Sequence, residues 1–143
     1  MKVAVILGTR PEIIKLSPII KQLNKKSTSV IFTGQHYDHN MGMSFIDQLG
    51  LNKPNYSMKI SKTKPDLQIS EIIKKLSGIF ALEKPENVIV QGDTNTVLAA
   101  GIASLKCNIS ISHIESGLRS NDWRMPEEHN RIIVDNFSDY LFT

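Results

Sequence analysis

Four short polar clusters stand where runs of apolar residues end, and three of them carry a carboxylate or a cation that packing cannot explain. The clusters span residues 8–12, 34–36, 91–96 and 113–120. Each follows a run of β-branched residues, as is typical of the buried strands of a parallel sheet, and ligands bind beyond the carboxyl ends of such strands. We therefore expect a catalytic site for an anionic substrate at this edge of the sheet. Its charged side chains are Arg10, Asp93, Glu115 and Arg119.

Arg10 stands at a strand-to-helix turn, where free backbone N–H groups and the helix dipole already favour an anion. An arginine adds bidentate recognition of phosphate. The alternative is a surface arginine that pairs with Glu12. Neither a Gly-x-Gly-x-x-Gly pattern nor a Walker phosphate loop follows the first apolar run, which argues against a dinucleotide cofactor.

Asp93 and Glu115 differ in how easily a structural role explains them. Asp93 follows Gly92 and precedes a helical pattern, so it could simply cap that helix. Glu115 ends an apolar strand and is followed by Ser-Gly, so we expect it to point into the crevice. His113 could be an oriented structural residue.

Glu127 and Glu128 open the last helical pattern, where negative charge is favourable in any case. Glu127 and Arg131 are four apart and could form an ordinary salt bridge. However, three separate segments now supply acids to one place, as acid–base catalysis requires. The four histidines show no metal-ligand spacing, and no nucleophile elbow is present.

Composition indicates a single globular domain of 143 residues with 41% hydrophobic content. Its apolar runs are far shorter than the ~20 residues of a membrane span, and we expect no membrane partner. Residues 3–7 are expected to be the first strand of a cytoplasmic protein, not a signal peptide. A net charge of +3 without interleaved aromatic residues argues against nucleic-acid binding. Cys107, the only cysteine, is expected to be buried.

Apolar periodicity predicts strands that alternate with helices. The predicted strands are 3–7, 30–32, 88–90, 109–114 and 140–142, and the predicted helices are 10–26, 40–50, 66–82, 95–106 and one that starts at Pro126 and buries Ile132, Ile133 and Phe137. This order predicts an α/β fold with a Rossmann-like parallel sheet and helices on both faces. We expect a capping box at Thr9–Glu12, a kink or break at Pro18, and a mobile loop over 52–65. Because the chain stops at Thr143, where a strand should hand over to a loop, we expect a fragment.

Four motifs together resemble the non-hydrolysing UDP-N-acetylglucosamine 2-epimerase family. They are Gly-Thr-Arg-Pro-Glu-Ile-Ile-Lys at 8–15, Gln-Gly-Asp-Thr-Asn-Thr at 91–96, His-Ile-Glu-Ser-Gly-Leu-Arg at 113–119 and Pro-Glu-Glu-His-Asn-Arg at 126–131. The resemblance implies a two-domain fold similar to the GT-B glycosyltransferases, with the substrate between the domains. Residues 1–143 would be the amino-terminal domain, incomplete at its carboxyl end, and the second domain would be absent from this chain.

The resemblance also implies an activity. The family interconverts UDP-N-acetylglucosamine and UDP-N-acetylmannosamine without metal or nicotinamide, so no cofactor is expected, and a homodimer is expected for the full-length form. By motif match the acid–base set is Asp93, Glu115 and Glu127, and the substrate-binding set is Arg10, Lys15 and Arg131. Which carboxylate removes the proton stays open. Since the family's second domain holds most uridine and phosphate contacts, we expect the isolated chain to have little or no activity.

Some residues depart from the family pattern. Gln35-His36-Tyr-Asp stands where many members read Gln-His-x-x-Met, and Gln68-Ile stands where relatives tend to have Gln-Thr. Gln35, His36 and Gln68 therefore mark a possible allosteric or substrate region in which allosteric activation is doubtful. Three other functions remain open: a hydrolysing epimerase that releases UDP and N-acetylmannosamine, a GT-B glycosyltransferase, and a non-catalytic split subunit that needs a separate carboxyl-terminal half.

Overall fold

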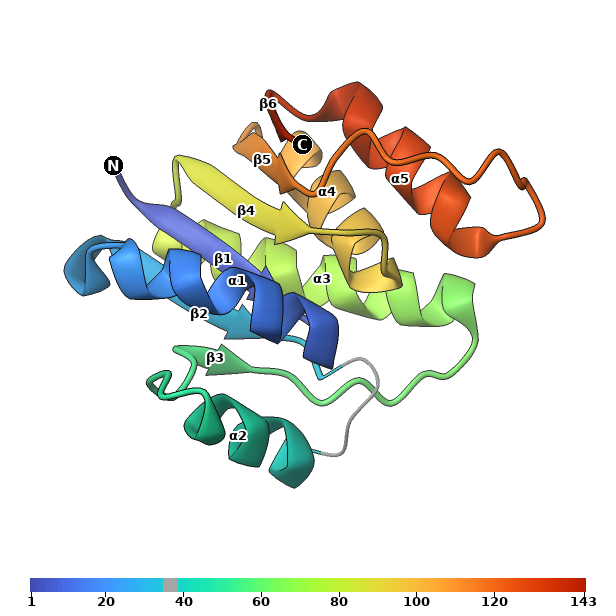
Figure 1. Cartoon of the computed structure of the whole chain (residues 1–143). Coiled ribbons are helices and arrows are strands. Elements are labelled where there is room, and N and C mark those ends of the chain that lie inside the picture. The colour runs from blue at the N-terminus through green and yellow to red at the C-terminus, as the bar shows by residue number, and fades with distance from the viewer. Residues whose placement is uncertain (35–38) are drawn as a thin grey trace.

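The computed structural model describes residues 1–34 and 39–143, except for the side chains of residues 39–41. The described strands form one six-stranded sheet in the order β3-β2-β1-β4-β5-β6, and every pair is parallel (Figure 1). They are β1 (Val3–Leu7), β2 (Thr28–Phe32), β3 (Tyr56–Ser57), β4 (Asn87–Gln91), β5 (Ser110–Ile114) and β6 (Tyr140–Phe142). The predicted Rossmann-like fold class is confirmed.

Helices cover both faces of this sheet. They are α1 (Arg10–Gln22), α2 (His39–Gln48), α3 (Pro65–Glu83), α4 (Asn95–Lys106) and α5 (Pro126–Phe137), with a short 3-10 turn at Lys25–Ser27. In β1, Val5 and Leu7 pack with α1 and α2, whereas Ala4 and Ile6 join a core with α3, α4 and α5. Figure 1 shows the same division, with α1 in front of the sheet and α3 behind it. Successive side chains of β1 thus point to opposite faces of the sheet and belong to two separate hydrophobic cores.

The direction of winding reverses between β1 and β4. From β1 the chain proceeds through β2 to β3 at one edge, and from β4 it proceeds through β5 to β6 at the other. At such a reversal the chain leaves the two neighbouring strands toward opposite faces of the sheet, and a crevice for ligands lies beyond the strand ends. The turns that follow β1 and β4 are therefore neighbours at this point.

Two expectations about the first half of the chain need revision. The stretch 52–65 is mostly irregular but contains the two-residue strand β3, whose flanking residues bond to β2: the Asn55 N–H donates to the Val30 carbonyl and the Met58 N–H to the Phe32 carbonyl. Pro18 does not split α1, which continues to Gln22, four residues short of the predicted end at 26. The capping box at Thr9–Glu12 is confirmed.

Two expectations about the second half also need correction. On α5, Phe137 packs against the core as expected and Ile132 is half-buried, whereas Ile133 is 40% exposed and Val134 is the fully buried apolar residue. Cys107 is exposed, because it follows the last turn of α4 at the surface. In the part of the chain that the structure describes, no helix is both long and apolar enough to cross a membrane.

Gly101 marks the closest contact between α4 and α5, and it provides a test of the packing. A Cβ atom there would lie 2.6 Å from the Phe137 ring, so Gly101→Ala should lower the free energy of unfolding by about 1–3 kcal/mol through overpacking. Gly78 on α3 has no atom within 4 Å of its added Cβ. Gly78→Ala should instead raise the free energy by about 0.5–1 kcal/mol through helix propensity. Urea denaturation measures both, and equal effects would contradict the packing.

Candidate active site

Glu115 stands at the end of β5 and is held by residues from two other elements. Its Oε2 accepts from Lys15 Nζ of α1 at 2.5 Å and from Gln91 Nε2 of β4 at 2.9 Å. Its φ of +63° is in the left-handed region, which is uncommon for a residue other than glycine. The carboxylate therefore turns across the ends of β4 and β1 toward α1, as its place after an apolar strand predicted. Its side chain is 35% exposed, so a ligand can reach it.

Asp93 follows β4 and is held by α5. Its Oδ2 accepts from Arg131 Nε and Nη2 at 3.0 and 2.9 Å, and its backbone carbonyl accepts from Asn130 Nδ2 at 2.8 Å. Thr94, not Asp93, caps α4, since its hydroxyl accepts from the Val97 N–H. The capping alternative for Asp93 is wrong, and its carboxylate is a partly exposed member of an ion pair.

The two glutamates that open α5 have different environments. Glu128 is 2% exposed, accepts from the N–H groups of Ser120 and Asn121, and pairs with Arg131 Nη1 at 2.8 Å. The Ser120 N–H, then the Asn121 N–H and Arg131, hold the pKa of Glu128 below its usual range. Glu127 is exposed and makes no hydrogen bond or ion pair with the described residues. The salt bridge considered for Glu127 is thus made by Glu128.

Arg10 does not pair with Glu12, so that alternative is wrong. The Arg10 guanidinium lies 4.6 Å from the centroid of the Phe45 ring of α2, a cation–π contact that leaves its N–H groups at the surface. It makes no ion pair with a carboxylate in residues 1–34 or 39–143. Of the three cations expected to bind substrate, Lys15 and Arg131 are already paired with site carboxylates.

His113 is fully buried and orients the turn that precedes Asp93. Its Nε2–H donates to the Gly92 carbonyl at 2.7 Å, and its Nδ1 lies 2.7 Å from Asp135 Oδ1. This confirms the structural interpretation of His113. Asp135 Oδ2 also accepts from Arg119 Nη1 and the Gly117 N–H. Burial would raise the pKa of Asp135, but these donors and His113 outweigh it and hold the pKa below its usual value.

Arg119 was expected in the crevice. Its Nη1 donates to Asp135 Oδ2 at 2.7 Å, and its side chain is 35% exposed. The pair ties the loop after β5 to α5, and Arg119, like Lys15 and Arg131, has a carboxylate partner in the free chain.

Glu12 is a buried carboxylate next to the site residues that sequence reasoning treated only as a capping residue. It is 1% exposed and accepts from the N–H groups of Gly8 and Thr9, at 3.2 and 2.5 Å, and from the Thr94 hydroxyl at 3.0 Å. Burial raises the pKa of Glu12 to about 7, although these hydrogen bonds oppose the rise. The capping box was the only signal, and it gave no indication of the bond to Thr94 across the crevice.

The three residues of the possible allosteric region can be assigned only in part. Gln35 and His36 lie outside the described residues. Gln68 of α3 is 7% exposed, and its Oε1 accepts from Asn95 Nδ2 of α4 at 3.3 Å. Gln68 therefore lies beside the start of α4, on the same side of the sheet edge as Asp93.

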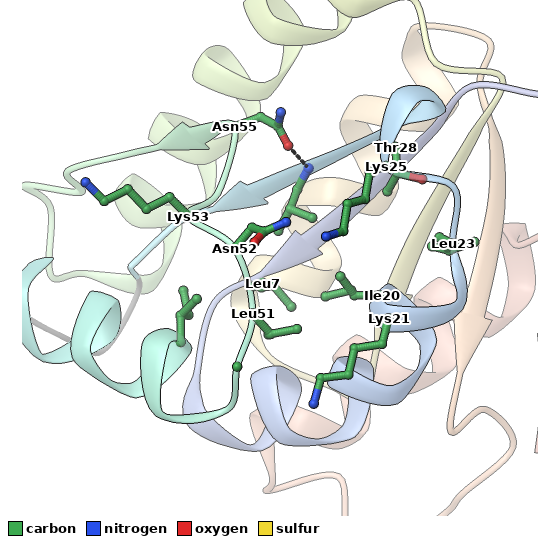
Figure 2. Close-up of a pocket in the computed structure, with 13 residues that line it drawn as sticks. Leu7, Ile20, Lys21, Leu23, Lys25, Thr28, Leu51, Asn52, Lys53 and Asn55 are labelled. Atoms are coloured by element: carbon green, nitrogen blue, oxygen red, sulfur yellow. Dashed lines mark hydrogen bonds between the residues drawn. The ribbon is translucent and has the colours of Figure 1, made fainter.

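A separate cavity of about 380 Å³ lies between the end of α1, the start of β2 and the segment after α2 (Figure 2). Leu7, Ile46 and Leu51 contribute apolar surface, and Lys21 and Lys25 contribute charge. None of the site residues named above lines it. The candidate site residues thus lie at the carboxyl ends of the strands and not in this cavity.

A Rossmann-like sheet that reverses its direction of winding belongs to the class of doubly wound α/β domains, which bind their ligands beyond the carboxyl ends of the strands. A family model described as UDP-N-acetylglucosamine 2-epimerase matches residues 20–143. The chain belongs to the UDP-N-acetylglucosamine 2-epimerase family.

Individual relatives agree with this assignment. The chain is 48% identical over 141 residues to the UDP-N-acetylglucosamine 2-epimerase of Methanococcus maripaludis, with 99% of this chain and 38% of the relative covered. It is 41% identical to the UDP-2,3-diacetamido-2,3-dideoxy-D-glucuronate 2-epimerase of Pseudomonas aeruginosa, with 99% and 41% covered. A crystal structure of Methanocaldococcus jannaschii UDP-GlcNAc 2-epimerase, in complex with UDP-GlcNAc and UDP, matches with a TM-score of 0.94 and 46% identity over 100% of this chain and 40% of that chain. The chain thus spans about two-fifths of its relatives' length, and its fold corresponds to the amino-terminal half of a GT-B-type enzyme.

The neighbouring residues Glu127 and Glu128 provide a matched test of the site's anatomy. Glu128→Ala removes a buried carboxylate that accepts from the N–H groups of Ser120 and Asn121 and from Arg131, and should lower Tm by roughly 5–10 °C. Glu127→Ala removes an exposed carboxylate and should change Tm by less than about 2 °C. Calorimetry separates the two outcomes, and a larger loss for Glu127→Ala would contradict the placement of α5.

Glu12 gives the stability of the chain a specific pH dependence. Its pKa is raised from 4.5 to about 7 on folding, so between these values the unfolded chain releases a proton that the folded chain retains. Stability due to Glu12 is therefore present below pH 4.5 and is lost as pH rises to 7, by about 3 kcal/mol in total. The difference in free energy of unfolding between wild type and Glu12→Gln should fall by that amount over this range. A constant difference would show that Glu12 is already ionised in the folded chain.

Proposed function

We propose that the protein interconverts UDP-N-acetylglucosamine and UDP-N-acetylmannosamine, and that this chain supplies its acid–base residues. The observation that carries the proposal is the Glu115 carboxylate, held by Lys15 and Gln91 at the reversal of the sheet. Asp93 lies after the neighbouring strand and is held by Arg131. Two partly exposed carboxylates, each beside a cation, stand where a charged nucleotide sugar would enter.

The reaction must proceed by elimination, because the C2 proton of the sugar has no adjacent carbonyl to make it acidic. A base removes that proton, the C–H electron pair forms the C1=C2 bond of a glycal, and the bond from C1 to the UDP oxygen breaks. In the reverse direction an acid delivers a proton to the opposite face of C2 and the UDP oxygen adds to C1. The net change is inversion at C2, which needs a base, an acid and cations that stabilise the departing pyrophosphate.

The residues divide between these roles by charge and exposure. Asp93, Glu115 and Glu127 form the proposed acid–base set, and Arg10, Lys15 and Arg131 the proposed cation set. Arg10 has no carboxylate partner in the described residues, so it is the cation most available to a pyrophosphate. Lys15 and Arg131 neutralise Glu115 and Asp93 in the free chain, and an incoming diphosphate competes with the carboxylates for them.

A second domain completes the site in this proposal. The match to only 38% of the Methanococcus maripaludis enzyme and 40% of the solved Methanocaldococcus jannaschii chain supports residues 1–143 as an amino-terminal domain of a longer GT-B-like enzyme. We propose that this longer protein works as a homodimer in the cytoplasm and that the isolated chain has little activity. A hydrolysing outcome and a split subunit with a separate carboxyl-terminal half are the competing proposals.

One observation favours a second candidate substrate. The Pseudomonas aeruginosa relative, 41% identical, is named for a UDP-2,3-diacetamido-2,3-dideoxy-D-glucuronate. That sugar also carries an acetamido group at C2, so the same elimination applies to it, and its carboxylate adds a charge for a cation to bind. The assay should therefore compare both nucleotide sugars.

A chimera tests the function in a complete enzyme. Residues 1–143 replace the matching 38% of the Methanococcus maripaludis epimerase, to which they are 48% identical. Proton NMR in D2O should show UDP-N-acetylglucosamine converting to UDP-N-acetylmannosamine with deuterium at C2, whereas the isolated chain should leave the spectrum almost unchanged. Free N-acetylmannosamine would instead indicate a hydrolase. Preference for the diacetamido-glucuronate would replace the substrate but keep the mechanism.

Variants in the same chimera test the residues. Asp93→Asn and Glu115→Gln should each lower kcat by roughly 10²–10⁴-fold, the usual range for losing a general acid or base. Asp47→Asn removes an exposed carboxylate of α2, outside the crevice, and serves as the matched control. Full activity in both site variants would refute the acid–base assignment.

A further inference from the structure

The Glu12 carboxylate joins the two turns that carry the proposed site residues. Its Oε2 accepts from the N–H groups of Gly8 and Thr9, directly before Arg10, and its Oε1 accepts from the hydroxyl of Thr94, directly after Asp93. These turns are 82 residues apart in sequence at Glu12 and Thr94. A single side chain therefore bonds to the turn that carries Arg10 and to the turn that carries Asp93.

The segments around the Glu12 carboxylate are closely packed. A Cβ on Gly8 would lie 2.5 Å from Thr96 Oγ1 and 2.9 Å from Glu12 Oε2. Thr96 in turn bonds to Thr33 at 2.9 Å, and both threonines are fully buried. The turn after β1, the end of β2 and the start of α4 are thus in direct contact around the buried Glu12 carboxylate. A shift of one of these segments therefore moves the other two.

Among the described residues, no ionisable group bonds to Glu12. The elements around it carry Arg10, Lys15 and Lys21 (α1), Lys106 (α4), and Glu127, Glu128, His129, Arg131 and Asp135 (α5), with Asp93 after β4 and His113 in β5. Those of the candidate site are engaged elsewhere: Arg10 with Phe45, Lys15 with Glu115, Asp93 and Glu128 with Arg131, and His113 with Asp135. Glu12 is stabilised only by N–H and O–H dipoles, including the amino-terminal turns of α1 and α4.

We propose that Glu12 is a positioning residue whose protonation state sets the spacing of the Arg10 and Asp93 turns. The assignment of Arg10 and Asp93 to the reaction rests on the proposed function. The ionised carboxylate accepts from both turns at once and draws them together. When Oε1 takes up a proton it becomes a donor, and the Thr94 hydroxyl, which already accepts from the Val97 N–H, has to turn its O–H hydrogen away from Glu12 and accept instead. The bond between the turns is then reversed and weakened.

A buried carboxylate of this kind changes its charge within the physiological range. Burial raises the pKa of Glu12 to about 7, so both forms are populated near neutral pH. The spacing of the two turns should therefore change most between about pH 6 and 8.

Backbone amide NMR of the isolated chain tests the coupling directly. The amides of Gly8, Thr9, Asp93 and Thr94 should share one inflection near pH 7, and Glu12→Gln, which stays neutral, should abolish it in all four. An inflection that belongs to a different group would persist in Glu12→Gln, so this variant identifies the contribution of Glu12. Persistence of the shared inflection, or titration of Gly8 and Thr9 without Asp93 and Thr94, would overturn the proposal. A purely structural role would change Tm and leave no pH-dependent shift to abolish.

Ligand affinity provides the second measurement. The measurement uses the chimera, which contains both domains. At pH 8, Thr94→Val removes the hydroxyl that binds Glu12 and should weaken UDP binding about tenfold, and Thr94→Ser, which keeps a hydroxyl, should restore it. Tm identifies any variant that has merely unfolded. Equal UDP affinity in the parent chimera and a folded Thr94→Val chimera would count against positioning. If the parent chimera binds no UDP at all, the proposed function loses support, and the amide titration still decides the role of Glu12.

Discussion

The contact between the turn after β1 and the start of α4 is the constraint on which the candidate site depends. Gly8 has no side chain, and Thr96 occupies the space a side chain would fill. Glu12 bridges the same two segments from below the crevice with hydrogen bonds to both. If this contact loosened, Arg10 and Lys15 on α1 would lose their fixed relation to Asp93 and Glu115 at the ends of β4 and β5. The reversal of the sheet supplies the crevice, and this contact gives it a defined width.

The carboxylates around the crevice are stabilised in distinct ways, and the differences follow their exposure. Glu12 has only dipoles, Glu128 has backbone N–H groups and Arg131, and Asp135 has Arg119 with His113. Glu115 and Asp93 remain partly exposed beside Lys15 and Arg131. A buried carboxylate with a full set of donors fixes structure, whereas an exposed pair can exchange partners with an anionic ligand at little cost. The candidate site thus has partly exposed ion pairs at its surface and buried, hydrogen-bonded carboxylates beneath them.

Local sequence signals predicted most of the fold and only part of the site. Helix α4 follows its apolar pattern residue by residue, and Pro126 marks the start of α5. By contrast, β3 has two residues in a Lys- and Ser-rich stretch, and only its bonds to β2 make it a strand. Periodicity predicted a buried Ile133, but contacts with α4 decide which residues of α5 are buried, and there Val134 is buried instead. Glu12 was recognised as a capping residue, but its burial depends on Thr94 and Thr96, which lie far away in sequence. Tertiary contacts of this kind leave no local pattern.

The outer strand of the sheet has a consequence for handling the molecule. β6 pairs with β5 on one side, and in the described part of the chain its other side has no neighbour, while Tyr140, Leu141 and Phe142 are each more than half exposed. An open strand edge with apolar side chains is a template for pairing with another copy. The edge of β6 is therefore the place at which we expect the purified polypeptide to self-associate at high concentration.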